Sequence, residues 1–198
     1  MNSPAPTKTY AQLIEQGLQA SASGDSTEAV ALFAQAASMD TSVGAPHFLM
    51  GSEFAANGEF DKAEECFVAA LLVQPQLSIV RYQLGLLQFT SARIAAAAMT
   101  WQPLLQDLPD THYLHQFVAG YLALANEDIP KALSHFDTGL SKNTENAPLS
   151  NDIRLVVTGL QQLGKHTSEE TSPASAASED AQSEHIFFAN YQRQGSLH

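Results

Sequence analysis

The sequence contains little cysteine, little positive charge and no long apolar run. Among its 198 residues there is one cysteine, Cys66, which excludes a disulfide within the chain. Nine Lys and Arg stand against 21 Asp and Glu, and the net charge of -12 excludes the basic surface that a nucleic-acid binder needs. No apolar run approaches the roughly 20 residues that span a bilayer. These shortages indicate a protein that neither binds nucleic acid nor inserts into a membrane.

The first ten residues also lack the features of a secretory signal. Lys8 is the only Lys or Arg between Met1 and Tyr10, and no apolar stretch follows it. We therefore expect a cytoplasmic protein whose residues 1–8 are flexible.

Three rows of residues recur along the chain at steps of 34 or 35 residues. The glycine row consists of Gly17, Gly51, Gly85 and Gly120. The alanine row consists of Ala29, Ala63, Ala97 and Ala132. The aromatic row consists of Phe33, Phe67, Trp101 and Phe136. Such a period indicates one repeated supersecondary unit, which buries its apolar face against its neighbours in the chain.

The motif within these repeats resembles that of the tetratricopeptide-repeat (TPR) family, W-x2-L-G-x2-Y followed by A-x3-F and P. The second repeat is the best match, with Met50-Gly51, Phe54, Gly58 at the turn, Ala63, Phe67, Ala70 and Pro75. The resemblance covers residues 10 to 146. It implies an all-α solenoid of helix–turn–helix repeats, wound as a right-handed superhelix. The expected repeats are residues 10–43, 44–77, 78–111 and 113–146.

Local signals mark where the helices begin and turn. Residues suited to cap a helix N-terminus are Thr9, Asp25, Ser78, Thr111 and Asp128. Gly24 and Gly58 fit the turns inside repeats. Pro103 lies inside a predicted helix, where it should kink the helix or end it early. It is either a tolerated kink near a helix end or a cause of altered groove curvature.

A helix with one apolar face follows the last repeat. Its apolar residues step by three or four and are Leu149, Ile153, Val156, Leu160 and Leu163. An open stack of repeats needs such a cap, so we expect a capping helix over 147–163 that ends at Gly164. The solenoid domain is then 9–164.

The composition changes after Lys165. Residues 165–184 are rich in Ser, Ala, Glu and Thr without periodicity, so we expect a disordered linker. Residues 185–198 form a short apolar segment whose large side chains are Ile186, Phe187, Phe188 and Tyr191. This segment either packs on its own solenoid or is a linear motif that binds a partner or another copy of the chain.

In the TPR family the first helix of each repeat lines a concave groove. Beside the glycine row, those helices carry a second apolar stripe, which predicts a partner-binding surface. Its residues are Ile14, Leu18, Phe48, Tyr82, Leu86, Phe89, Leu114, Phe117, Tyr121 and Leu124. Two alternatives remain open: superhelical twist buries the stripe between repeats, or the chain's own terminal segment covers it.

Some TPR proteins hold the carboxylate of a chaperone C-terminus in a clamp of Lys, Asn and Arg. The matching positions here are Ile14, Leu18, Leu49, Ile79 and Gln83. Only Gln83 can donate a hydrogen bond, so this clamp is absent. The predicted groove instead suits an apolar or amphipathic segment with aromatic anchors.

The sequence carries no motif of a catalytic or cofactor site. It has no phosphate-binding glycine loop and no G-x-S-x-G. His112 and His115 are spaced to share one helix face, but no Cys or further His joins them at metal-ligand spacing. We expect no enzyme activity, no cofactor and no metal.

These observations predict a non-enzymatic adaptor that binds an apolar or amphipathic polypeptide segment in the concave TPR groove. The alternative is a TPR chaperone for one secreted or aggregation-prone client, similar to the acidic chaperones of type III secretion. The expected partner is another protein or the chain's own C-terminal segment, and a homodimer through groove or tail is conceivable.

Overall fold

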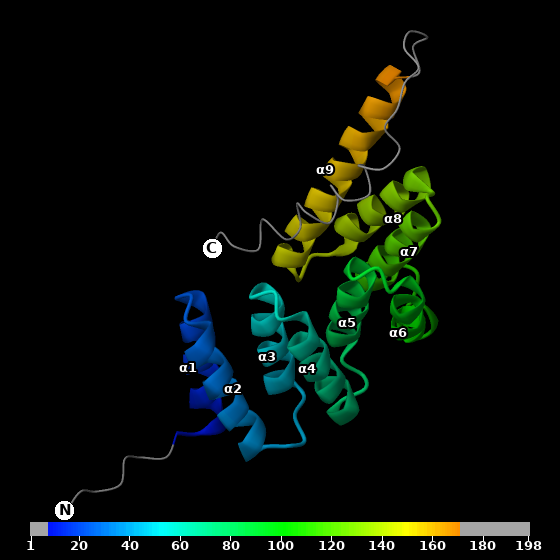
Figure 1. The fold of residues 1–198 in the computed structure, drawn as a ribbon. Helices are drawn as coiled ribbons and strands as arrows, with labels where there is room; N and C mark the ends of the chain where they lie inside the picture. The colour runs from blue at the N-terminus through cyan, green and yellow to red at the C-terminus, as the bar shows by residue number, and fades with distance from the viewer. Residues whose placement is uncertain (1–7, 171–198) are drawn as a thin grey trace, which may run out of the picture. The chain divides into compact units, whose positions relative to one another are not determined.

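The computed structural model describes residues 8–170, and their regular structure is entirely α-helical (Figure 1). The N-terminal residues 1–7 and the segment 171–198, which includes Ile186, Phe187, Phe188 and Tyr191, lie outside the described residues. The helices are α1 (Tyr10–Ala22), α2 (Ser26–Met39), α3 (Ala45–Ala56), α4 (Phe60–Val73), α5 (Ser78–Thr90), α6 (Ile94–Asp107), α7 (Tyr113–Ala125), α8 (Ile129–Lys142) and α9 (Ala147–Glu170). No described helix has the length and apolar character that crossing a membrane requires.

The described residues form two compact units, 8–87 and 88–170, and the boundary falls within α5 after Leu87. In the first unit α1 packs on α2, α2 on α3, and α3 on α4. In the second unit α6 packs on α7, α7 on α8, and α8 on α9. Figure 1 shows α1 beside α2 and α3 beside α4 in the first unit, and α7 beside α8 in the second, with the two helices of each pair running in opposite directions.

The glycine and aromatic rows meet inside the helix pairs. A Cβ atom built on Gly17 would lie 2.4 Å from Cε1 of Phe33, and one on Gly120 would lie 2.5 Å from Cε1 of Phe136. The same contact recurs at Gly51. Only glycine allows the ring of the second helix to pack this close to the first, so the spacing of the two rows reflects their direct contact.

The turns inside the four repeats share one backbone geometry. Gly24 and Gly58 have φ values of 81° and 76° in the first two turns, and Ala92 and Glu127 have φ values of 59° in the last two. In every turn the amide of the following residue donates to the carbonyl five residues earlier, at 2.8 to 3.0 Å, as in a Schellman motif. Ala92 and Glu127 therefore hold a left-handed conformation that glycine adopts without strain.

Three of the predicted helix caps are present. Thr9 forms a reciprocal capping box at α1, and the carboxylates of Asp25 and Asp128 accept from backbone amides at α2 and α8. The prediction for Thr111 was wrong. His112 caps α7 instead, because its Nδ1 accepts from the amide two residues further on, at 3.1 Å.

Pro103 does not end its helix early, because α6 continues to Asp107. A proline removes one backbone N–H, whose usual partner here would be the carbonyl of Met99. Met99 is 75% exposed, so its carbonyl lies on a face that water can reach.

The helix α9 also runs further than expected. We predicted an end at Gly164, but the helix continues to Glu170. A glycine inside a helix costs only about 1 kcal/mol and does not by itself terminate it. The buried side of α9 contains Leu149, Ile153, Val157 and Leu160, so Val157 takes the buried place that we had given to Val156.

Candidate functional site

The first unit contains the accessible part of the predicted apolar stripe. Leu18 on α1 is 48% exposed. Ile14, one turn earlier, is half-buried and packs against the core cluster that includes Phe33 of α2 and Met50 of α3. Phe48 on α3 is also half-buried, with its ring 5.9 Å from that of Phe67. The first helices of the two repeats thus carry an apolar face that solvent still reaches.

The rest of the stripe is mostly buried. Tyr82 is fully buried, and Leu86 is nearly so, in the part of α5 that belongs to the first unit. In the second unit the structure buries Phe89, Leu114, Phe117 and Tyr121, and leaves Leu124 half-buried.

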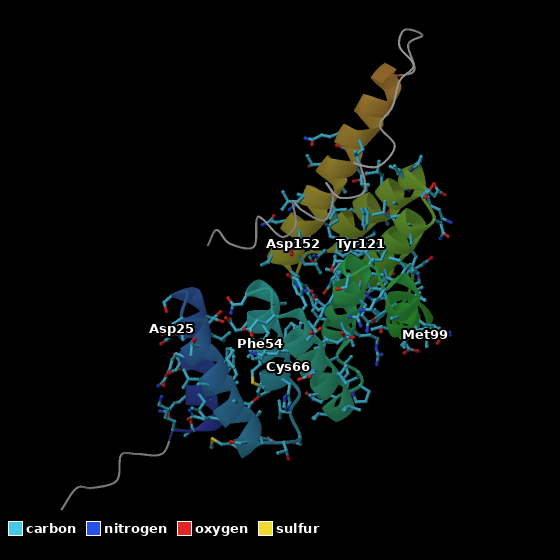
Figure 2. All side chains as sticks on the ribbon, in the orientation of Figure 1. Asp25, Phe54, Cys66, Met99, Tyr121 and Asp152 are labelled. Atoms are coloured by element: carbon cyan, nitrogen blue, oxygen red, sulfur yellow. The ribbon has the colours of Figure 1, made fainter. Side chains whose placement is uncertain are left out.

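The aromatic residues of the second unit form one interior cluster. The ring of Tyr121, labelled in Figure 2, lies 5.2 Å from Phe89, 5.7 Å from Trp101 and 5.1 Å from Phe136. These separations are typical of favourable aromatic pairs. Placing glutamate at Tyr121 would therefore disturb the core, so a test of partner binding needs an exposed residue instead.

Some exposed apolar side chains were not singled out from the sequence. Val68 and Leu72 lie one turn apart on α4, and Leu72 is 80% exposed. The positions that match Leu72 in the other repeats are Ser38, Gln106 and Ser141. A large apolar residue where the other repeats are polar was the signal that could have revealed it.

A hollow of about 420 Å³ opens in the second unit between α6, α7 and α8. Its apolar wall includes Leu105, Ala119 and Leu122, and its polar side includes His115, Lys131 and His135. In the sequence, His115 stood out only together with His112, as two candidate metal ligands on one helix face. That pairing did not bring in His135, which lies 20 residues further on and reaches the hollow from α8.

Hydrogen bonds hold the two imidazole rings at the hollow. Nδ1 of His115 lies 3.0 Å from the carbonyl oxygen of Leu108, which can only accept, so Nδ1 donates. Nδ1 of His135 lies 2.8 Å from Oε1 of Gln116. The Nε2 amide of Gln116 donates to the carbonyl of Asp110, which fixes Oε1 as the acceptor from His135. Nδ1 therefore carries the proton in both neutral rings, and Nε2 of His135 is the atom that gains a proton when that ring becomes charged.

The environment disfavours the charged form of His135. Burial lowers the pKa of its imidazole below the ordinary value of 6.5, and the positive charges of Lys131 and His115 lower it further. A protonated His135 ring would therefore be repelled by the positive charges of these neighbours.

The remaining titratable residues do not assemble into a catalytic or metal site. Among residues 8–170, no group of three His, Cys, Asp or Glu side chains could hold a metal ion. Cys66 packs against the cluster of α2 and α3, with its sulfur between α4 and α2 in Figure 2. Burial, and then the negative charge of Glu65, raise the pKa of this thiol, so it is a poor nucleophile at neutral pH.

Three antiparallel helix pairs, each closing a glycine on an aromatic ring, give the described residues a helical-repeat fold. Residues 48–107 match the tetratricopeptide repeat family. Together with the nine described helices, this match gives the described residues an all-α, TPR-type fold. No curated protein matches the sequence at a significant level.

The fold is similar to that of several solved structures. The Pseudomonas aeruginosa protein PilF has a TM-score of 0.61 and 17% identity, and the match covers 96% of this chain and 77% of that one. For YrrB, described as a TPR protein with an unusual peptide-binding site, the TM-score is 0.54 and the identity 16%, with coverages of 95% and 87%. For the APC/C hetero-tetramer Cut9–Hcn1 the TM-score is 0.69 and the identity 17%, with coverages of 95% and 34%. At these identities the likeness shows the fold alone.

Proposed function

We propose that this chain is a non-enzymatic adaptor that binds an apolar or amphipathic polypeptide segment on the first helices of its first two repeats. The observation that carries the proposal is the exposure of Leu18, at 48%, one turn after the half-buried Ile14, together with the half-buried Phe48 on the first helix of the next repeat. Apolar side chains on adjacent helices form the kind of groove that receives an amphipathic segment.

The charge around this face favours a particular kind of segment. Glu15 is exposed on α1, and Glu53 is half-buried on α3. The whole chain has a net charge of -12, so electrostatic steering favours a basic partner. The best ligand would place an apolar anchor on Leu18 and basic side chains beside it.

The fold is compatible with this function. TPR repeats act in general as scaffolds for protein–protein contacts, and YrrB is described as having a peptide-binding site. That description belongs to YrrB, and it shows that the fold can support peptide binding. Neither the motif search of the sequence nor the described side chains offer a set of catalytic groups, which favours a binding role.

The proposal is tested with a pair of variants on one helix. Leu18→Glu places a charge on the apolar face, while Gln19→Glu introduces the same charge at the exposed neighbouring residue. We expect Leu18→Glu to lower partner recovery in co-purification at least tenfold, and Gln19→Glu to leave it unchanged. Helicity measured by circular dichroism should be wild-type in both. Equal recovery with both variants would contradict binding at this face.

The same preparations distinguish the candidate partners. A partner that is insoluble without this chain would favour the chaperone alternative, whereas a folded, soluble partner would favour the adaptor. Deleting residues 171–198 tests whether the chain's own C-terminal segment competes for the face. If it does, the deletion should increase both partner recovery and the binding of a hydrophobic dye, and Leu18→Glu should abolish the increase.

A further inference from the structure

The hollow in the second unit exists because one repeat has a small residue where the others have a larger one. Ala119 precedes the repeat glycine Gly120, and the matching residues in the second and third repeats are Met50 and Leu84. Ala119 lines the hollow. A larger side chain there would occupy part of its volume.

The polar side of the hollow is also particular to the fourth repeat. His135 stands where the second and third repeats have Cys66 and Thr100. The ring is anchored through Gln116, which is itself 91% buried and bonded to the backbone before α7. Such a chain of hydrogen bonds fixes the direction of the imidazole and limits its freedom to turn away.

The ionisable side chains that line the hollow are two imidazoles and one ammonium group. His115 and Lys131 face His135, and both lower the pKa of its imidazole. Asp107 and Asp110 lie at the end of α6 and in the following loop, while Glu127 and Asp128 lie in the turn before α8. Asp128 is occupied as the cap of α8, where it accepts from the amide of Lys131. None of the residues that line the hollow is acidic, although the net charge of the chain is -12.

We propose that this hollow is a second binding site, separate from the face around Leu18, which receives an acidic side chain of a partner polypeptide. The carboxylate would accept hydrogen bonds from Nε2 of the protonated His115 and His135 and from the ammonium of Lys131. Leu105 and Leu122 would pack against the methylene groups of the ligand and an adjoining apolar residue. A volume of about 420 Å³ is in the range of small-ligand pockets, and it suits one or two side chains.

The site couples ligand binding to protonation. In the free protein, burial and two positive neighbours oppose the charging of His135. A bound carboxylate supplies the missing negative charge, so it raises the pKa of the ring and binds better when the ring is protonated. The hollow lies in the second unit and is formed by other residues than the face around Leu18, so this second site is independent of the proposed function.

The test uses the full chain and two peptides that differ only in charge. The probes are N-acetyl-Leu-Glu-Leu-amide and its neutral analogue with glutamine, titrated at pH 6 and pH 8 while NMR follows the ring signals of His115 and His135. We expect the glutamate peptide to bind at least tenfold more tightly than the glutamine peptide at pH 6, and to weaken by about tenfold at pH 8. It should also raise the pKa of the His135 ring and shift the ring signals of His115. Equal binding of the two peptides, or binding independent of pH, would overturn the proposal.

Two variants and one control test whether the glutamate peptide binds in the hollow. Ala119→Leu fills the hollow with the residue that the third repeat already carries, so it should abolish glutamate-peptide binding in a protein of unchanged helicity. Lys131→Gln removes one cation, and Lys62→Gln makes the same change at the matching position of the second repeat. We expect only Lys131→Gln to weaken the peptide several-fold.

Inorganic phosphate tests whether the hollow binds an acidic side chain specifically or attracts any anion. Inorganic phosphate at the same concentrations should shift the ring signals less than the glutamate peptide does, because it cannot use the apolar wall. Equal binding of phosphate, or full retention of peptide binding in Ala119→Leu, would show a general attraction of anions and sink the idea of a side-chain site. Loss of partner recovery in Leu18→Glu with unchanged peptide binding would separate the two proposals.

Discussion

The left-handed residue in each of the four turns inside the repeats allows a test of stability. Substitution to glycine should stabilise the protein there, and substitution of glycine should destabilise it. Ala92 and Glu127 occupy the left-handed region at φ 59°, where Gly24 and Gly58 stand in the first two repeats. A residue with a Cβ atom is disfavoured there by about 1–2 kcal/mol. Glycine at the same place removes this strain but gives the unfolded chain more freedom, which offsets about 0.4–1 kcal/mol. We expect Ala92→Gly and Glu127→Gly each to stabilise by about 0.5–1 kcal/mol.

The reverse change is equally well defined. A Cβ atom added to Gly24 would meet nothing within 4 Å, and the same holds for Gly58. The cost of Gly24→Ala is therefore that of the backbone alone, about 1 kcal/mol. No loss or gain of packing complicates the comparison.

The assay is urea unfolding followed by circular dichroism. With a slope of about 2 kcal/mol per molar urea, a change of 1 kcal/mol moves the midpoint by about 0.5 M. Ala34→Gly, on the exposed side of α2, is the control, because the same replacement inside a helix should destabilise by about 1 kcal/mol. A lower midpoint for Ala92→Gly, or an unchanged midpoint for Gly24→Ala, would refute the reasoning from backbone conformation.

Two further predictions concern packing and protonation. Gly17→Ala would place a Cβ atom 2.4 Å from the Phe33 ring, so it should lower the free energy of unfolding by about 1–3 kcal/mol, and Gly17→Ala with Phe33→Leu should recover part of the loss. Burial, and then the positive charge of His115, lower the pKa of the His112 cap, against an opposing effect of Glu145. The unfolded chain then binds the proton more readily, so stability is full above pH 6.5 and falls as the pH drops below it. Thermal unfolding between pH 8 and 5.5 measures this fall in stability. In His112→Asn the capping side chain does not titrate, so an equal fall in stability with pH in that variant would contradict the prediction.

The repeat architecture was predictable because its defining contacts are close in sequence. Gly17 and Phe33 meet across a single turn, and the same pair recurs with a fixed period in the other repeats. The turn and cap residues act even more locally. Ala92 and Glu127 show the limit of such signals, because a Schellman turn forms there without the glycine that predicts it.

The candidate sites were less predictable. An apolar stripe on a helix indicates that some partner covers it, but not whether that partner is the next repeat or another protein. Phe117 and Tyr121 follow the same pattern as Leu18, yet the structure buries both, Tyr121 inside the aromatic cluster, and leaves Leu18 half exposed. Neighbours decide the difference, and the pattern along one helix does not contain them.

The sequence by itself determined that this chain contains a series of helix pairs with a period of 34 or 35 residues, because each pair is specified by residues a few turns apart. Only the tertiary structure decided which apolar residues solvent still reaches. It alone brought His115 of α7, Lys131 and His135 of α8 and Leu105 of α6 to one hollow. The physical reason is that surface exposure and the clustering of ionisable groups depend on how separate helices pack. The pattern of residues along one helix does not specify that packing.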